Sequence, residues 1–308
     1  MPGGFEKEIE RARSASGDEL NALIYHPAPV VLAALLDNPA FEEGKLLLLL
    51  ARKDVPADVL ENIGARKELM KSYAVKKALV FHAKAPRLVA LRLLKDLYLM
   101  DLVQFALSTS VAAELKRYAE EQVVAKLPQL ALGQKITLAR RGPARVAGAL
   151  VAEGHAQVLP IALNNPFLTE AQVLKALARD KVSTTVVQSL ARHSKWSQSY
   201  HVRLALVRHP ATPVSVVLGI LPLLTVSDLR ELAAPGIVAE NLRKYLQAEV
   251  QRRMAASKKH ASREMSVPYG ESTPQTQDQE RSEKKENGGK GKSGADRDGR
   301  PEESDDET

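Results

Sequence analysis

Basic side chains in the second half of the chain are the residues whose type and spacing could do chemistry, and that chemistry is the binding of anions. Arg140, Arg141 and Arg145 form a local cluster. Further lysines and arginines follow, with the single tryptophan beside one of them, at Lys175, Arg179, Lys195, Trp196, Arg203 and Arg208. Groups of one sign attract partners of the other sign, so these positions are candidates for binding a phosphate track or an acidic protein segment.

Signatures of an enzyme are missing from the sequence. The chain has no cysteine, which excludes a disulfide framework, a thiolate-held zinc or iron–sulfur centre and a cysteine nucleophile. It has no His-Glu-x-x-His pair, and Gly291-Lys292-Ser293 lacks the earlier glycine of a phosphate-binding loop, because Glu286 stands there. We therefore expect a protein without catalytic residues, cofactor or metal; an enzyme whose site forms only in space stays an alternative.

The segments that would position the basic groups follow a helical pattern. Apolar residues recur at spacings of three and four in short runs, as in Val59, Leu60 and Ile63, and the runs are separated by Asn-Pro, His-Pro and Ala-Pro turns. Helix starts are indicated at Thr169 and at Pro213. Alternating runs typical of strands are absent from the sequence. The pattern predicts an all-α protein built from many short helices.

An internal duplication is the strongest signal in the chain. A single constant offset pairs Leu23 with Leu150 and runs without a gap to Val123 with Val250, and 33 of these 101 pairs are identical. The identical pairs include Asn38-Pro39 with Asn165-Pro166, Ser72-Tyr73 with Ser199-Tyr200, His82 with His209, and Asp101-Leu102 with Asp228-Leu229. A self-match at a fixed period is typical of repeat architectures. We therefore predict a tandem duplication, with residues 1–127 as the first copy and residues 128–254 as the second.

A shorter period inside each copy leads to a family resemblance. The segments LLDNPAFEEGKLLLLL, ALNNPFLTEAQVLKAL and LVRHPATPVSVVLGIL each carry an Asn-Pro or His-Pro turn between apolar runs. They resemble the units of HEAT-like and leucine-rich-repeat-variant proteins over roughly residues 18–254. The resemblance implies a right-handed α-solenoid of stacked helix pairs with a concave binding surface. The chain departs from those variant-repeat proteins that carry a cysteine-ligated iron–sulfur domain, because it has no cysteine.

Residues that are identical in both copies are predicted to be structural. His82 and His209 lie near expected helix ends, where an imidazole can bond terminal carbonyls. The asparagines before proline suit a turn, and Tyr73 and Tyr200 suit a core position with a satisfied hydroxyl. Trp196 replaces Leu69 and has two interpretations, either a packed ring in the core or an exposed stacking surface beside Lys195.

Charge separates the two copies. Residues 1–127 contain 18 basic and 17 acidic residues, for a balance of +1, whereas residues 128–254 contain 16 and 7, for a balance of +9. The second copy is basic because it lacks acids at the positions that correspond to Glu42, Asp58, Glu61, Glu114, Glu120 and Glu121. Two interpretations stay open, a solvated surface that maintains solubility and a binding surface for an anionic partner.

The last segment is predicted to be a charged tail. From residue 255 to 308 the chain carries 10 basic and 13 acidic residues and no periodic apolar face, which predicts disorder. Its acidic end is a hypothetical competitor for ligands of the basic copy. The uncharged stretch 210–227 is interrupted by Pro213 and Pro222, so we expect a buried helix pair there instead of a membrane span. The first residues lack the apolar region of a signal peptide, which favours a cytoplasmic protein.

Three functions agree with these features. The first is a non-enzymatic α-solenoid scaffold that binds a protein or peptide partner, expected to be acidic, through a basic concave surface. The alternative is a HEAT-like protein that binds nucleic acid through the basic second copy, for which a steep salt dependence would be diagnostic. HEAT-like folds include DNA glycosylases, but no motif carries that assignment to a position here. The third is an enzyme whose site the sequence does not reveal. The oligomeric state is open.

Overall fold

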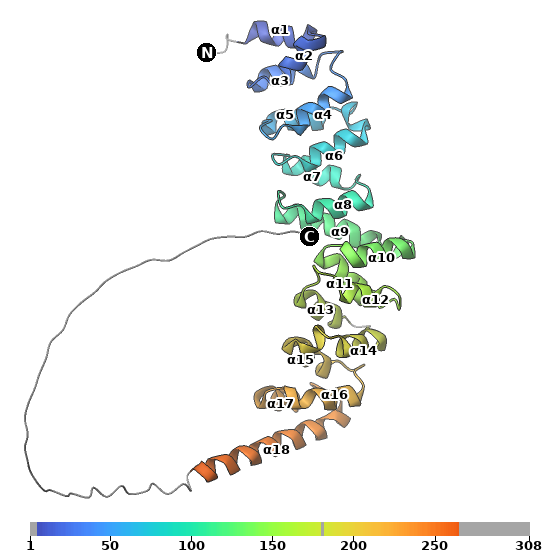
Figure 1. Ribbon diagram of the computed structural model, residues 1–308, viewed down its shortest axis with the longest axis vertical. Helices are drawn as coiled ribbons and strands as arrows, with labels where there is room; N and C mark the ends of the chain where they lie inside the picture. Colours follow the sequence, from blue (N-terminus) through green and yellow to red (C-terminus); the bar gives the residue numbers. More distant parts are fainter. Residues whose placement is uncertain (1–4, 180–181, 265–308) are drawn as a thin grey trace, which may run out of the picture. The chain divides into compact units, whose positions relative to one another are not determined.

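The computed structural model describes residues 5–179 and 182–264, and in this part of the chain every regular element is a helix (Figure 1). It contains 18 α-helices and four short 3₁₀ helices, and no strand occurs among the described residues. The all-α prediction is therefore confirmed. The described residues up to Lys258 belong to one compact unit, which includes segments of both predicted copies.

The first half of the chain contributes nine α-helices and one 3₁₀ helix. In chain order these are α1 (Glu6–Ser14), α2 (Gly17–Leu23), α3 (Pro29–Leu35), α4 (Glu43–Ala51), α5 (Ala57–Ala65), η1 (Leu69–Lys71), α6 (Tyr73–Phe81), α7 (Arg87–Leu94), α8 (Leu99–Leu107) and α9 (Ala113–Lys126). Most are too short to be stable alone, since an isolated helix below about 12 residues is marginal in water. Their stability must come from packing.

The second half contains a similar series of elements. In chain order these are η2 (Leu127–Gln129), α10 (Leu132–Arg141), α11 (Ala144–Glu153), α12 (Leu159–Leu163), α13 (Glu170–Leu177), α14 (Thr184–Arg192), η3 (Trp196–Gln198), α15 (Tyr200–Arg208), α16 (Val214–Ile220), η4 (Leu221–Leu223), α17 (Val226–Leu232) and α18 (Glu240–Glu264). The offset from η1 to η3 equals the offset from α6 to α15, and both equal the offset at which the sequence matches itself.

Local sequence explains where these helices begin. The side chains of Ser72, Thr169, Ser183 and Ser199 each accept a hydrogen bond from a backbone N–H in the first turn of the following helix. Thr169 therefore marks a helix start, as predicted. Pro213 lies one residue earlier than expected for a helical position, since it is the N-cap of α16 and keeps an extended backbone.

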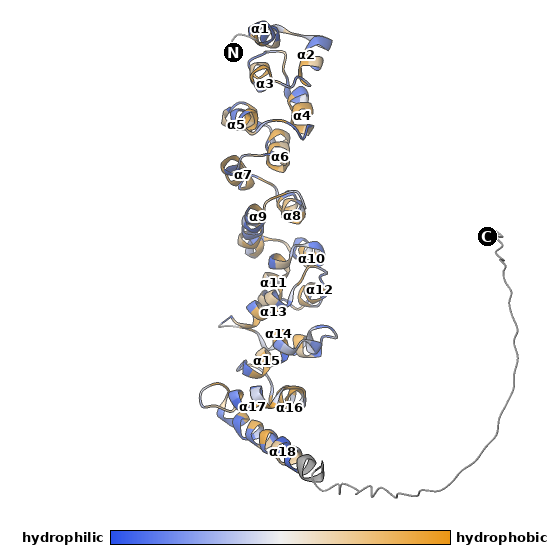
Figure 2. Ribbon diagram, turned by 90° about the vertical axis from the view of Figure 1, so that its left-hand side faces the viewer, coloured by the Kyte–Doolittle hydropathy of each residue, from blue (hydrophilic) through white to orange (hydrophobic). Residues whose placement is uncertain are grey.

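The helices pack on neighbours along the chain and on the helix after next. Contacts join α9 to α11, α11 to α13 and α13 to α15 in succession, while α10 contacts α12 and α12 contacts α14. Figure 2 shows the same separation in the first half, where α2, α4, α6 and α8 lie on one side and α3, α5, α7 and α9 on the other. The basic residues are thus divided between two rows of helices.

One apolar cluster runs through the layers. The stripe residues Val59, Leu60 and Ile63 are buried, and so are the second-half residues Leu190 and Leu206. Side chains at spacings of three and four lie on one face of a helix, and burial of that face is the main favourable contribution to folding. The apolar periodicity of the sequence therefore identified the core faces.

Two buried asparagines make equivalent bonds at corresponding positions of the two halves. The Nδ2 of Asn38 donates to the carbonyls of Ala12 and Ala15 at 2.8 and 2.9 Å. The Nδ2 of Asn165 donates to the carbonyls of Ala139 and Gly142 at 2.8 and 3.0 Å. Each asparagine also accepts a backbone N–H two residues on, which is the predicted turn before proline. Each side chain joins its own turn to the preceding helix pair.

Tyrosine and histidine contacts recur in the same way. The Tyr73 hydroxyl donates to Asp101 and accepts from the N–H of Tyr98, and Tyr200 makes the equivalent bonds with Asp228 and Thr225. His82 is the C-cap of α6; its Nε2 lies 2.6 Å from the carbonyl oxygen of Arg52, and its Nδ1 accepts the N–H of Lys84. The satisfied hydroxyls predicted for Tyr73 and Tyr200 are confirmed, but both rings are only partly buried, and the carbonyl contact predicted for the histidines is present at His82.

The C-terminal boundary differs from the prediction. Helix α18 continues past residue 254, where the tail was expected to begin, and ends at Glu264. The added residues are mostly alanine, lysine, arginine and glutamate, which are good helix formers even without an apolar face. The rest of the predicted tail, with its acidic end, lies outside the described residues.

The stretch 210–227 is divided among α16, η4 and the start of α17. The breaks coincide with Pro213 and Pro222, as the proline pattern indicates. Among the described residues, no helix has the length and apolar character needed to span a bilayer.

Candidate anion-binding site

Lys175 lies in helix α13 and Arg179 lies just after its end. Two sets of contacts fix the residue at which this helix starts. Thr169 caps it by accepting the N–H of Gln172. The preceding turn is held by the buried amide of Asn165, which is bonded to the end of α10 and to Gly142. Because α13 starts at a fixed point, the helical spacing places Lys175 on the helix surface and Arg179 just after its end.

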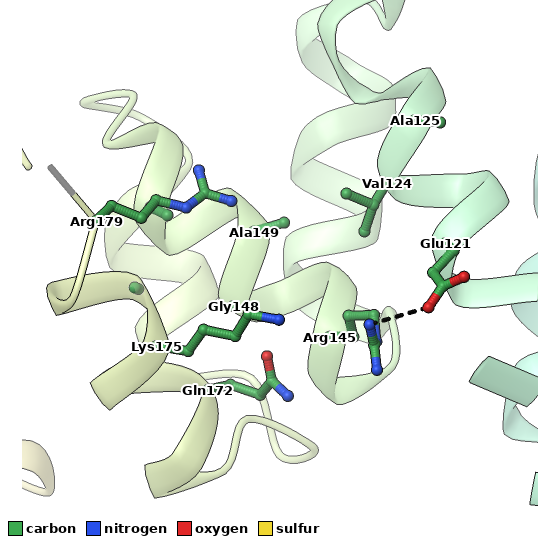
Figure 3. A pocket seen from close by; sticks show the side chains of 11 residues that line it. Glu121, Val124, Ala125, Arg145, Gly148, Ala149, Gln172, Lys175 and Arg179 are labelled. Carbon is green, nitrogen blue, oxygen red and sulfur yellow. Dashed lines mark hydrogen bonds and ion pairs between the residues drawn. The ribbon is translucent and has the colours of Figure 1, made fainter. Parts of the chain in front are cut away.

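A glycine lets α11 and α13 approach closely. A Cβ atom added at Gly148 would lie only 2.8 Å from the Cβ of Gln172 and 3.0 Å from its Oε1. Any larger residue at this position would force the helices apart. Glycine is unfavourable in a helix interior, so its presence in α11 reflects this close approach. The approach brings the side chain of Gln172 toward Arg145 (Figure 3).

A cavity of about 250 Å³ lies where α9, α11 and α13 meet, and it gathers three of the predicted basic residues (Figure 3). Arg145, Lys175 and Arg179 line it together with the amide of Gln172 and the carboxylate of Glu121. The remaining lining consists of small or aliphatic residues, namely Val124, Ala125, Gly148, Ala149, Ala152 and Ala176. The described lining therefore combines basic side chains with small and aliphatic ones.

Arg145 is already engaged by acids from α9. Its Nε lies 3.3 Å from Glu120 Oε2, and its Nη1 donates to Glu121 Oε1 at 3.3 Å. Burial raises the pKa of the Glu120 carboxyl, and the positive charge of Arg145 opposes that rise. This arginine thus joins α11 to α9 and contributes less free charge to the cavity than its residue type suggests.

Lys175 and Arg179 are exposed, and neither forms an ion pair within the described part of the chain. The first half has a different residue at the first position and the same residue, with an ion-pair partner, at the second. Lys175 corresponds to an exposed leucine, Leu48. Arg179 corresponds to Arg52, whose guanidinium bonds both carboxylate oxygens of Asp54 at 3.0 and 2.6 Å.

In the first half, the arginine that corresponds to Arg179 is neutralised by Asp54. The hydrogen bonds from Arg52 lower the pKa of Asp54 to about 2. The guanidinium of Arg52 also reaches back to the carbonyls of Ile24 and His26. In the sequence, Lys53-Asp54 corresponds to Asp180-Lys181, so the order of base and acid is reversed, and both of these second-half residues lie outside the described part of the chain. Within the described residues, Arg179 forms no ion pair equivalent to the one between Arg52 and Asp54.

A second cavity, of about 660 Å³, adjoins the first at Arg179 and lies between α13 and α15. Its basic and imidazole lining consists of Arg179, His201, Arg208 and His209, and no acidic side chain of the described residues lines it. Arg208 donates through Nη2 to Glu231 at 2.6 Å, and His201 Nδ1 lies 2.9 Å from Glu170 Oε1. Burial lowers the pKa of His209, which favours its neutral form.

The predicted arginine cluster is split between the two rows of helices. Arg140 and Arg141 are exposed at the end of α10, whereas Arg145 lies in α11. The chain turns between them at Gly142-Pro143. Arg141 instead lines a cavity of about 600 Å³ with residues of α8 and its C-terminal end, among them Met100 and Leu107.

The remaining candidates lie away from the two adjoining cavities. Trp196 is 3% exposed, and its indole N–H donates to the carbonyl of Leu163 at 2.9 Å, so the ring is packed and not a stacking surface. The ammonium of Lys195 lies 4.3 Å from the Trp196 ring centre. Arg203 is held by the carbonyl of Ser197 at 2.6 Å and lines a separate cavity with residues of α14 and α16.

Sequence reasoning missed the uncharged and imidazole part of the site. Gln172, Gly148 and Leu204 contribute to the two cavities, but none of them has a charge that composition would reveal. One signal was available. Leu204 and Arg208 replace Lys77 and Phe81 of the first half, so a comparison of the halves for changes other than lost acids would have pointed to the space between α13 and α15.

No family model, curated protein or solved structure matches this chain. Among the described residues, no group of three or more histidine, aspartate and glutamate side chains is placed to hold a metal ion. The geometry of the basic cavities is therefore the basis for a functional assignment.

Proposed function

We propose that this protein is a non-enzymatic α-solenoid scaffold that binds an acidic protein segment on the face formed by α11, α13 and α15. The observation that carries the proposal is the gathering of Arg145, Lys175 and Arg179 around one cavity, with the last two lacking an acidic partner among the described residues. Exposed cations on a fixed scaffold attract carboxylates and increase the rate of association.

The repeat architecture supports a scaffold. Asn38 and Asn165 make equivalent bonds, as do Tyr73 and Tyr200, and the self-match of the sequence pairs these same positions. We infer a tandem duplication of HEAT-like or leucine-rich-repeat-variant type, in which one copy retains neutralised positions and the other has acquired a binding face. Repeat arrays present extended surfaces and commonly bind other macromolecules.

The lining of the cavities favours a protein segment over nucleic acid. Single-stranded nucleic acids are bound by aromatic rings on which the bases stack, but among the described residues no phenylalanine, tyrosine or tryptophan lines either adjoining cavity. The lining alternates cations with small and aliphatic side chains, which suits carboxylates carried on a polypeptide that also has apolar side chains. The nucleic-acid function remains the competing outcome of the test.

The test compares two labelled probes on the full chain, a peptide of alternating glutamate and serine and a DNA duplex, by fluorescence anisotropy across a salt series. We expect the peptide to bind more tightly than the duplex at physiological salt. We expect K175E/R179E to weaken peptide binding about tenfold or more, because the reversal places like charges next to the ligand.

R140E/R141E is the matched control, because it changes the net charge by the same amount on exposed residues of the other helix row. We expect it to change peptide affinity by less than about threefold, since distant exposed charges are screened. Equal losses in both double variants would overturn the assigned face. Tighter binding of the duplex, weakened by K175E/R179E, would replace the acidic-protein function with nucleic-acid binding.

A further inference from the structure

We propose that the cavity between α13 and α15 takes an apolar side chain from the acidic segment, and that Arg179 and Arg208 bind carboxylates on either side of it. This inference rests on the proposed function and deepens it, because it specifies a partner motif in which an apolar anchor is flanked by acids. Its basis is the combination of apolar walls and a cationic rim in one cavity.

The walls of the cavity are apolar. They are formed by Leu174, Leu177, Ala178, Leu204, Ala205 and Pro210. The volume of about 660 Å³ lies within the range of about 300–1,000 Å³ that is typical of ligand pockets. An aromatic or large aliphatic side chain, with part of its backbone, would remove much apolar surface from water there.

The rim of the cavity selects a negative partner. Arg179 makes no ion pair in the described part of the chain, and Arg208 uses only Nη2 for its bond to Glu231. Among the described residues, two acids near the rim already have partners: Glu231 accepts from Arg208, and Glu170 accepts from Ser199 and lies against His201. A carboxylate beside the anchor would meet the guanidinium of Arg179 and the donors of Arg208 that Glu231 does not use, and guanidinium groups bind carboxylates in fork geometry.

Comparison with the first half shows that the combination of apolar walls and a cationic rim is specific to the second half. Leu204 corresponds to Lys77, whose Nζ pairs with Asp101 at 2.8 Å. Arg208 corresponds to Phe81, which packs edge-on against Phe105. The replacement of Lys77 by leucine exchanges a charged group for an apolar wall, and the replacement of Phe81 by arginine adds a cation. The first difference supplies the apolar wall and the second supplies a cation at the rim, so the two features occur together in the second half.

Lys175 on α13 and Arg145 on α11 continue the row of basic side chains from Arg179, so the partner needs several negative groups in a row. A fatty acid supplies an apolar chain but only one carboxylate. A polypeptide with consecutive acids supplies both the anchor and the series of charges. The cavity and the cationic surface together therefore indicate a peptide and not a lipid.

The experiment measures binding of two labelled seven-residue peptides to the full chain by fluorescence anisotropy. One has phenylalanine between two groups of three acidic residues, and the other has serine in its place. We expect the phenylalanine peptide to bind about tenfold more tightly or better, because its ring is buried. Competition with decanoate tests whether the cavity binds a fatty acid instead of a peptide. Displacement of the peptide by decanoate at comparable concentration would overturn the peptide assignment.

L204K tests the cavity itself. This variant restores the residue of the first half, and the lysine would face Asp228 as Lys77 faces Asp101, so the fold is expected to be retained. The added cation should strengthen binding of any acidic peptide, but the preference for phenylalanine should fall to less than about threefold as the apolar wall is lost. L88K adds the same charge at an exposed leucine of α7 and should leave the preference unchanged.

The outcomes separate the two proposals. Equal binding of both peptides, abolished by K175E/R179E, would overturn the cavity inference and leave the proposed function intact. A preference for phenylalanine that survives L204K would overturn the assigned cavity. Failure of both peptides to bind would overturn the proposed function, and this inference with it.

Discussion

Single polar side chains hold successive layers of this molecule together. The Asn165 amide is buried and bonds two carbonyls at the end of α10, so its removal would leave both acceptors without a partner away from water. We expect Asn165→Ala to lower the free energy of unfolding by about 2 kcal/mol, the usual cost of unsatisfied buried groups. Urea unfolding of the full chain, followed by the fluorescence of the buried Trp196, measures the change.

The neighbouring asparagine provides the control. Asn164 is exposed, and its amide bonds only the carbonyl of Pro160 within α12. Asn164→Ala should change the free energy of unfolding by no more than about 0.5 kcal/mol, as is usual for surface positions. Similar losses in the two variants would contradict the role of the buried amide.

Two histidines should make the stability depend on pH. Burial lowers the pKa of His209, and burial together with the charge of Lys195 lowers the pKa of His193, both from 6.5. The folded protein keeps these rings neutral at a pH where the unfolded chain takes up protons. Their contribution to the free energy of unfolding is therefore complete above about pH 6.5 and is lost as the pH falls below it.

We accordingly expect H193Q/H209Q to reduce the loss of stability between about pH 7 and pH 5.5, whatever its effect on stability at neutral pH. The measurement is a set of thermal or urea unfolding curves at several pH values. His155→Gln, at an exposed position, serves as the control. An unchanged pH dependence in the double variant would show that these two rings do not govern it.

At the level of helices, the first cavity depends on the short distance between α11 and α13. Gly148 allows α11 to approach α13, and a methyl group there would meet Gln172. We expect Gly148→Ala to destabilise the fold by about 1–3 kcal/mol through overpacking and to weaken acidic-peptide binding as α13 shifts. Unfolding curves and peptide anisotropy on the same variant measure both effects.

Gly133 in α10 is the matched position. A Cβ atom added there meets no atom within 4 Å, so Gly133→Ala should stabilise the fold by about 0.4–1 kcal/mol by restricting the unfolded chain. Opposite signs for the two substitutions are the expected result. Equal stabilisation by both would mean that α11 and α13 are not in close contact.

The helices themselves were easier to predict from the sequence than the way in which they pack against one another. Apolar spacing and turn residues indicated the short helices, and Thr169 marked a start correctly. Proximity in the sequence was misleading for Arg140 and Arg145, because the break at Gly142-Pro143 places them on helices of different rows. The row on which a helix lies depends on its packing against segments about 30 residues away in the sequence. The local pattern of apolar residues does not encode this packing.

The difference between the two halves defines the molecule as a whole. Both halves keep the same asparagine and tyrosine bonds, while the second half lacks acids that neutralise cations in the first. Counting charges predicted this asymmetry. It did not predict which cations share a cavity, since Arg203 is held by a backbone carbonyl and Arg145 by two glutamates, whereas Arg179 is unpaired among the described residues.

Hydrogen exchange of the full chain, with and without the acidic phenylalanine peptide, tests the central claim most directly. Binding slows exchange where it suppresses local opening. We predict slower exchange in α11, α13 and α15, with no change in α4 and α6, which occupy the positions of the first half that correspond to α13 and α15. Slowing confined to α4 and α6, or spread equally over both halves, would contradict the assignment of the binding face to the second half.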